Sequence, residues 1–201
     1  MGIPIVLTMV FLTVSWIAEA ICLKGARWRT PSLTLIACGL LLVCLIAQLS
    51  FPGLLVLFER DTTRILAGEW WRMGTALFFQ DGGLVGGLTN IVTLFWIGNV
   101  VEQVRSRWYW LLISIGGALI AECFALRWQP VGAGNSVATC SLAGSLIMNR
   151  PFSRVPTVSK VLRAVAILIV LLLVAAHDVH GVAGMTGILL SVLVSNRLRR
   201  A

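Results

Sequence analysis

Long apolar runs constrain this chain more than any other feature of its sequence. A helix needs about 20 apolar residues to cross a bilayer, and such runs recur along the whole chain. Only 12% of the 201 residues are charged and 58% are hydrophobic, whereas a soluble domain carries about 25% charged residues. Disorder is excluded as well, because it requires low hydrophobicity. The sequence therefore predicts an all-α fold, a polytopic bundle of membrane helices.

Seven candidate spans follow from the apolar runs: residues 2–23, 33–57, 83–104, 108–127, 133–149, 160–176 and 179–196. The fifth is rich in small and polar residues, so we expect protein rather than lipid to surround it. Cytoplasmic loops carry an excess of Lys and Arg. With the N-terminus outside, only Arg60, Arg64, Arg72 and Arg127 of the 16 basic residues lie in outside segments. The count predicts an N-out, C-in chain.

The net charge of +8 has the same explanation, so nucleic acid is not an expected partner. The five cysteines contain no C-x-x-C pair and lie in or beside apolar runs, which favours buried thiols over a zinc site or a disulfide framework.

The first span lacks a basic leading region and is too long for a signal peptide, so we expect it to be retained. Residues 58–82 are amphipathic and are expected to lie at the membrane interface.

Three polar side chains are predicted at one depth. The third, fifth and seventh spans all run from outside to inside, and Asn90, Ser136 and His180 lie near their starts. At about 1.5 Å per residue, all three fall in the outer part of the membrane. Serine and histidine are the minimal set for nucleophilic acyl transfer, and a carboxamide can stabilise an oxyanion.

Each of these residues also has a structural interpretation. A serine in an apolar helix often packs or bonds to its own backbone, and a histidine at a span start often lies at the interface. His177 is an alternative base on a neighbouring face. Asp178 projects about 160° away from His180 if both are helical, so the prediction is a dyad without an acidic member.

The segments around these residues match a known family. GNSVATCSLAG begins at Gly134 and carries Ser136, HGVAGMTG begins at His180, and TNIVTLFWIGNVVE carries Asn90. They resemble the helices that hold the nucleophile, the base and an oxyanion donor in the rhomboid intramembrane serine proteases. The resemblance implies that Asn90 and the backbone N–H of Ser136 hold the oxyanion.

Two further stretches resemble the same family. GEWWRMGTALFF, with Trp71 and Arg72, is similar to its tryptophan–arginine stretch in the first outer loop, and Gly98 and Glu102 match the G-x-x-x-E that ends its second core helix. The resemblance implies a six-helix core with a short basic tail over residues 33–201. Residues 1–32 would then be an extra N-terminal span with a basic inside loop.

The resemblance implies a serine endopeptidase that cleaves transmembrane substrates near the outer face by a Ser-His dyad, with no metal and no cofactor. The expected partners are membrane-protein substrates or clients and the lipid bilayer. Compact loops and a short chain favour a bacterial plasma membrane, with the C-terminus in the cytoplasm.

Three departures from the family pattern keep an alternative open. Val137 replaces the glycine after the nucleophile and crowds the place of a substrate carbonyl. Gly86 replaces a histidine and removes an oxyanion donor, a loss typically worth about 10²–10³ in turnover, and Gln80 replaces another histidine. The alternative is an inactive rhomboid-like protein that binds membrane clients. A transporter is disfavoured, because only Glu19 and Glu122 are acidic residues well inside a run.

Overall fold

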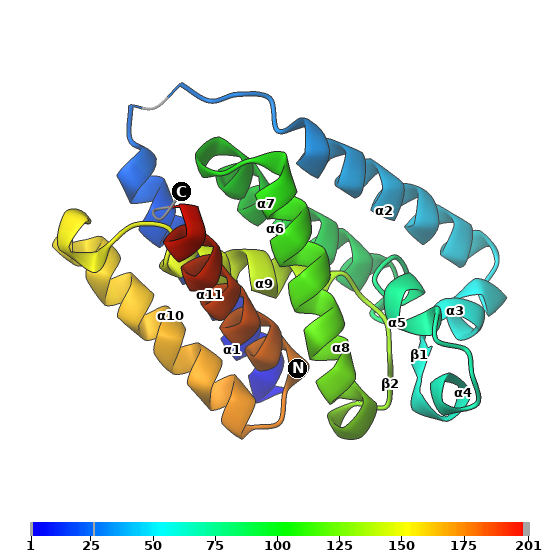
Figure 1. Ribbon diagram of the computed structural model, residues 1–201. Coiled ribbons are helices and arrows are strands. Elements are labelled where there is room, and N and C mark those ends of the chain that lie inside the picture. Colours follow the sequence, from blue (N-terminus) through cyan, green and yellow to red (C-terminus); the bar gives the residue numbers. More distant parts are fainter. Residues whose placement is uncertain (1, 26, 199–201) are drawn as a thin grey trace.

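Helices make up most of the computed structural model, which describes residues 2–25 and 27–198 (Figure 1). The tail residues Arg199 and Arg200 lie outside it. The helices are α1 (Ile3–Ala20), α2 (Ser32–Ser50), α3 (Gly53–Phe58), α4 (Thr62–Leu66), α5 (Arg72–Thr75), α6 (Gly83–Val104), α7 (Arg107–Leu111), α8 (Gly117–Trp128), α9 (Ser136–Ile147), α10 (Thr157–Ala175) and α11 (Val179–Leu198). Two strands, β1 (Arg60–Asp61) and β2 (Val131–Gly132), form an antiparallel pair.

Five helical segments are long and apolar enough to cross a membrane: Ile3–Leu23, Ser32–Ser50, Gly83–Val104, Arg107–Trp128 and Thr157–Ala175. The fourth joins α7 to α8 through a π-helical turn at Leu112–Gly116. Large apolar side chains on these helices face outward, such as Ile36 and Val43 on α2, which are 67% and 64% exposed. An apolar exterior of this kind suits lipid, so the chain is a polytopic helical membrane protein, as the sequence predicts.

Three of the seven expected spans differ from the structure. The seventh, expected over 179–196, is not among the five crossing segments, because the apolar helix that α11 forms in the described part of the chain, Val179–Val194, is shorter. The second was expected to reach residue 57, but α2 ends at Ser50 and the separate helix α3 follows. Pro52 explains the break, because proline lacks the N–H that a continuing helix would need. The fifth was expected over 133–149, but α9 has only 12 residues. At 1.5 Å per residue it is about 18 Å long, too short to cross a bilayer.

Helix α9 lies inside the bundle, in contact with α11, α1, α6 and α8. From Val137 to Ile147 all but one of its residues are buried, which confirms that protein surrounds this weakly apolar segment. Glycines allow the close approach. A Cβ on Gly144 would collide with the carbonyl of Gly184 on α11, and one on Gly187 would collide with the carbonyl of Ser141 on α9. This contact fixes how the starts of α9 and α11 face each other.

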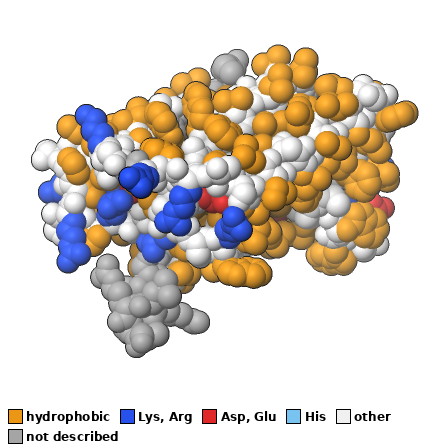
Figure 2. Space-filling view, turned by 90° about the horizontal axis from the view of Figure 1, so that it is seen from above, with side chains coloured by type: hydrophobic (Ala, Val, Ile, Leu, Met, Phe, Trp, Pro, Cys, Tyr) orange, Lys and Arg blue, Asp and Glu red, His pale blue; other side chains and the backbone are white. Residues whose placement is uncertain are grey.

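The two ends of the bundle differ in charge. The end formed by residues 23–25, 27–31 and 148–156, here called the basic end, carries five Lys and Arg side chains, and Figure 2 shows Lys and Arg side chains gathered on one side of the molecule. Here the Glu102 carboxylate accepts hydrogen bonds from the N–H and hydroxyl of Thr34, both at 2.7 Å, and so caps the start of α2. Gly98 lies one turn earlier, where a Cβ would collide with Thr34. This pair holds α6 against α2.

The opposite end, here called the site end, contains the starts of α6, α9 and α11 and the stretch from α3 to α5 (Figure 1). Arg72 is fully buried and donates to the carbonyls of Val56 and Glu59, at 3.0 and 2.9 Å. It thereby ties α5 to the end of α3, whereas the Trp71 ring beside it is 55% exposed. The β1–β2 pair joins this stretch to the loop that leads into α9.

Candidate active site

Ser136 and His180 meet at the site end of the bundle. Ser136 is the first residue of α9, and His180 is the second residue of α11. The Ser136 Oγ lies 2.9 Å from the His180 Nε2, within the hydrogen-bond reach of about 2.6–3.2 Å required of a nucleophile and its base. Both side chains are half-buried, so they contact the protein interior and remain accessible.

Asp178 contacts the other ring nitrogen of His180, which the sequence argument did not foresee. Its Oδ1 lies 2.7 Å from the His180 Nδ1 and accepts the His180 backbone N–H at 2.9 Å. The helical projection that placed Asp178 on the far face was wrong, because Asp178 lies before α11 and is not helical. Aspartate just before a helix is a common N-cap, and that signal would have identified it.

The Asp178 carboxylate is well suited to accept a hydrogen bond from the His180 ring. Burial raises its pKa, but the hydrogen bonds and charge of His180 outweigh that effect, so the pKa of Asp178 lies below its usual value. The carboxyl group is therefore ionised near neutral pH. The Gln129 Nε2 approaches its second oxygen at 3.5 Å.

Asn90 approaches the same place from α6. A Cβ built on Gly134 would lie 3.4 Å from both the Asn90 Nδ2 and the Ser136 Oγ. The amide nitrogen and the hydroxyl therefore border one small space beside the Gly134 Cα. A side chain at position 134 would fill that space, which explains why the loop needs glycine there.

Gln80 holds the Asn90 amide in this orientation. The Asn90 Nδ2 donates to the Gln80 Oε1 at 2.8 Å, and the Gln80 Nε2 donates to the Asn135 Oδ1 at 2.9 Å. The backbone of Gln80 is in turn bonded on both sides by the Gln48 carboxamide, at 2.6 and 2.8 Å. The sequence identified Gln80 only as a changed loop residue. Its role as a buried bridge depends on contacts between distant segments.

A cavity of about 100 Å³ adjoins Ser136, His180 and Asn90. Its wall also contains the buried ion pair between the Arg60 Nη1 and the Glu122 Oε2, 2.6 Å apart. The Arg60 Nε donates to the carbonyl of Gln129 at 3.0 Å. The cavity is thus small and lined by polar groups, a setting in which a charged intermediate interacts strongly with fixed dipoles.

The remaining sequence candidates differ in where they lie relative to this cavity. Val137 is buried and lines it. A Cβ at Gly86 would meet nothing within 4 Å, so the structure leaves open space there. His177, the alternative base, is exposed and its ring lies edge-on to Trp128, with 5.0 Å between the centroids. His180 is therefore the histidine that faces Ser136.

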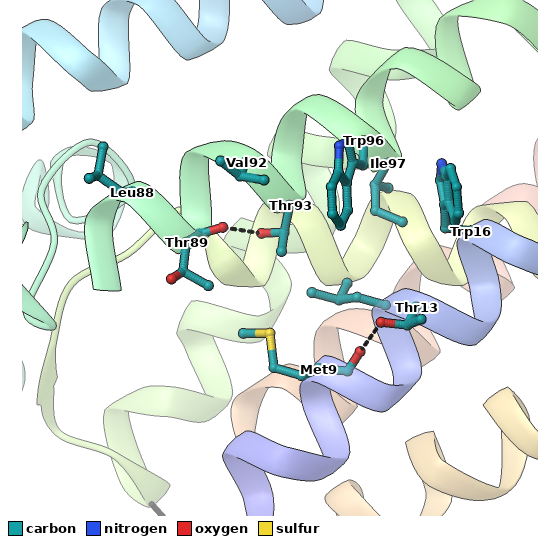
Figure 3. A pocket seen from close by; sticks show the side chains of 10 residues that line it. Met9, Thr13, Trp16, Leu88, Thr89, Val92, Thr93, Trp96 and Ile97 are labelled. Atoms are coloured by element: carbon teal, nitrogen blue, oxygen red, sulfur yellow. Dashed lines mark hydrogen bonds between the residues drawn. The ribbon is translucent and has the colours of Figure 1, made fainter. Parts of the chain in front are cut away.

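A larger cavity of about 460 Å³ lies between α1 and α6. Trp16 and Trp96 stack across it with centroids 6.0 Å apart (Figure 3). The hydroxyls of Thr13 and Thr93 donate to carbonyls of their own helices, at 2.8 and 3.0 Å. None of the described residues that line this cavity is titratable.

One of the comparisons with known proteins found a match. The model of the Rhomboid domain matches residues 67–199, well over half of the chain. The match includes the segments that carry Asn90, Ser136 and His180. Comparisons with curated proteins and with solved structures each found no match.

Proposed function

The chain belongs to the rhomboid family of intramembrane proteases, and from that premise we propose that it is a serine endopeptidase that acts within the membrane. The observation that carries the proposal is the 2.9 Å approach of the Ser136 Oγ to the His180 Nε2. It brings together a hydroxyl and an imidazole from two separate helices, beside a small cavity lined by polar groups.

The proposed reaction follows from the positions of these groups. His180 accepts the proton of the Ser136 hydroxyl as the oxygen attacks the scissile carbonyl of the substrate. The imidazolium then protonates the leaving amine, which leaves an acyl group on Ser136. A water molecule that enters the cavity is deprotonated by His180, attacks the acyl carbon and releases the second product.

The negative oxygen that forms during attack requires hydrogen-bond donors. The Asn90 Nδ2 borders the space beside the Ser136 Oγ. Ser136 is the first residue of α9, so its backbone N–H has no acceptor one turn earlier in the helix. In our proposal these two groups hold the oxyanion, and the Gln80 bridge keeps the amide nitrogen directed towards it.

The proposed substrates are membrane proteins with a transmembrane segment. We infer an N-out, C-in chain from the charge distribution, which puts the site end near the outer face, and a bacterial plasma membrane as the location. Residues 33–201 are proposed as the rhomboid-like core, and residues 1–32 as an added span.

Two observations favour a second candidate, an inactive rhomboid-like protein that binds membrane clients. Val137 lines the cavity where the family has a glycine, and Gly86 leaves open space where the family has a histidine that donates to the oxyanion. Both changes weaken catalysis but leave Ser136 and His180 in contact.

Labelling with a fluorophosphonate in detergent distinguishes the two candidates. We expect wild-type protein to be labelled and Ser136→Ala to remain at background. Ser145→Ala is the matched control, because this serine of α9 donates to the carbonyl of Leu142 and its loss should not affect labelling. Absence of labelling in folded wild-type protein, or equal labelling of Ser136→Ala, would support the inactive alternative.

A further inference from the structure

Asp178, His180 and Ser136 form a continuous line of contacts. The Asp178 Oδ1 lies 2.7 Å from the His180 Nδ1, and the His180 Nε2 lies 2.9 Å from the Ser136 Oγ. The Asp178 side chain is 8% exposed and the His180 side chain is 24% exposed. Water therefore screens the contact between carboxylate and imidazole only weakly.

This contact determines where the proton sits on a neutral imidazole. A carboxylate can only accept, so the ring nitrogen that faces it must carry a hydrogen. With the proton on Nδ1, Nε2 has a free lone pair directed at the Ser136 hydroxyl. That tautomer is the one a general base requires, and the same carboxylate stabilises the imidazolium that forms when the serine proton is transferred.

We propose that Asp178 is a positioning residue that holds His180 in the Nδ1–H tautomer and adds a third member to the Ser136–His180 dyad. The inference rests on the proposed function for its effect on turnover. Its effect on the histidine ring is independent of turnover. The family resemblance implied only a dyad, without an acidic member.

A purely structural role makes a different prediction. Asp178 also accepts the backbone N–H of His180 at 2.9 Å, which caps the start of α11. Asparagine caps helices about as well as aspartate, but its carboxamide is uncharged and can donate as well as accept. Asp178→Asn therefore preserves the cap and removes the feature that fixes the tautomer.

The chain offers a matched control for this substitution. Asp61 caps α4 by accepting the backbone N–H of Arg64 at 3.2 Å. Asp61→Asn makes the same chemical change at another helix start, away from the His180 ring. Asp178→Glu is the conservative variant, because it keeps the carboxylate on a longer side chain.

The first measurement is ¹⁵N NMR of full-length protein in micelles with labelled histidine. The chain contains only two histidines, so His177→Gln assigns both rings. At about pH 8.5, where an ordinary imidazole is neutral, we expect Nδ1 of His180 to be protonated and Nε2 to be unprotonated. Asp178→Asn should shift the ring to the other tautomer or to a mixture, and Asp61→Asn should leave it unchanged.

The second measurement is the rate constant of fluorophosphonate labelling. We expect Asp178→Asn to lower it by about 10³- to 10⁴-fold, with partial recovery in Asp178→Glu and an unchanged unfolding temperature. A His180 ring that keeps the wild-type tautomer in Asp178→Asn would overturn the inference. If wild-type protein is not labelled at all, the proposed function fails, and the NMR comparison still decides the role of Asp178.

Discussion

Two polar clusters occupy opposite ends of this bundle, and they differ in whether their groups border a cavity. The site cluster consists of Asn90, Gln80, Ser136, Asp178 and His180. The basic-end cluster consists of Glu19, Asn149, Arg150 and Arg163. In the latter, the Glu19 carboxylate is fully buried and accepts from all three partners, at 2.7–2.9 Å. In the former, the Ser136 hydroxyl and the Asn90 amide border a cavity.

The difference shows how one bundle separates stability from reactivity. A carboxylate saturated by donors from three segments holds those segments together and has nothing left to offer a ligand. Here it ties α1 to α10 and to the loop after α9. A hydroxyl beside a base and an open cavity contributes little to packing, but it is accessible for chemistry. Substitutions in the basic-end cluster should therefore mainly lower stability, whereas substitutions in the site cluster should mainly lower the reaction rate.

The largest expected effect is on stability, in Glu19→Ala. The change leaves the fully buried Arg163 side chain without its carboxylate partner, and breaking a buried ion pair costs about 3–5 kcal/mol. Denaturant unfolding in detergent should show this loss, while the labelling rate per folded molecule stays unchanged. Thr13→Ala on the same helix, where the hydroxyl is exposed, is the control. Unchanged stability in Glu19→Ala would remove the distinction between the clusters.

The second effect is on rate, in Asn90→Ala. Loss of one oxyanion donor should lower the labelling rate by about 10²–10³-fold, with a loss of stability of only about 1 kcal/mol from the broken bond to Gln80. The matched control is Asn99→Ala, since Asn99 is half-buried on the same helix and bonds to Gln103. Equal labelling rates in both variants would mean that Asn90 contributes to packing and does not stabilise the oxyanion.

The smallest expected change in rate is a gain, in Val137→Gly. Removing the branched side chain from the cavity wall should raise the labelling rate by about tenfold, the usual scale for a few methyl groups in a pocket. The variant should also be less stable, because a buried valine contributes about 1.5–3 kcal/mol. Val137→Ala should give an intermediate rate. A slower Val137→Gly would show that the valine does not obstruct the cavity.

The sequence predicts most of this architecture, because helix length and membrane thickness are tightly linked. Apolar runs located four of the five crossing helices to within about three residues at each end, and the start of the other, α2, to within one residue. One error arose where the apolar run continues but the helix cannot, because Pro52 ends α2 early. The length of α9 was overestimated for a different reason, because composition does not reveal where the loop before Ser136 ends.

The site was predictable only in part. Equal depth on three spans led to Asn90, Ser136 and His180, and the structure brings these residues together around one cavity. Asp178 was missed because a helical projection was applied to a residue that precedes its helix. Gln80 contacts Asn90 and Asn135 across long sequence separations, and no local pattern encodes such a bridge.

The central claim is that His180 activates Ser136, and the most direct test is the position and rate of fluorophosphonate attachment, measured by peptide mass spectrometry. The account predicts a single adduct, on the peptide that contains Ser136. It also predicts that His180→Ala slows its formation by at least about 10³-fold without unfolding the protein. An adduct on a different residue, or the same rate of attachment to Ser136 in His180→Ala, would contradict the account.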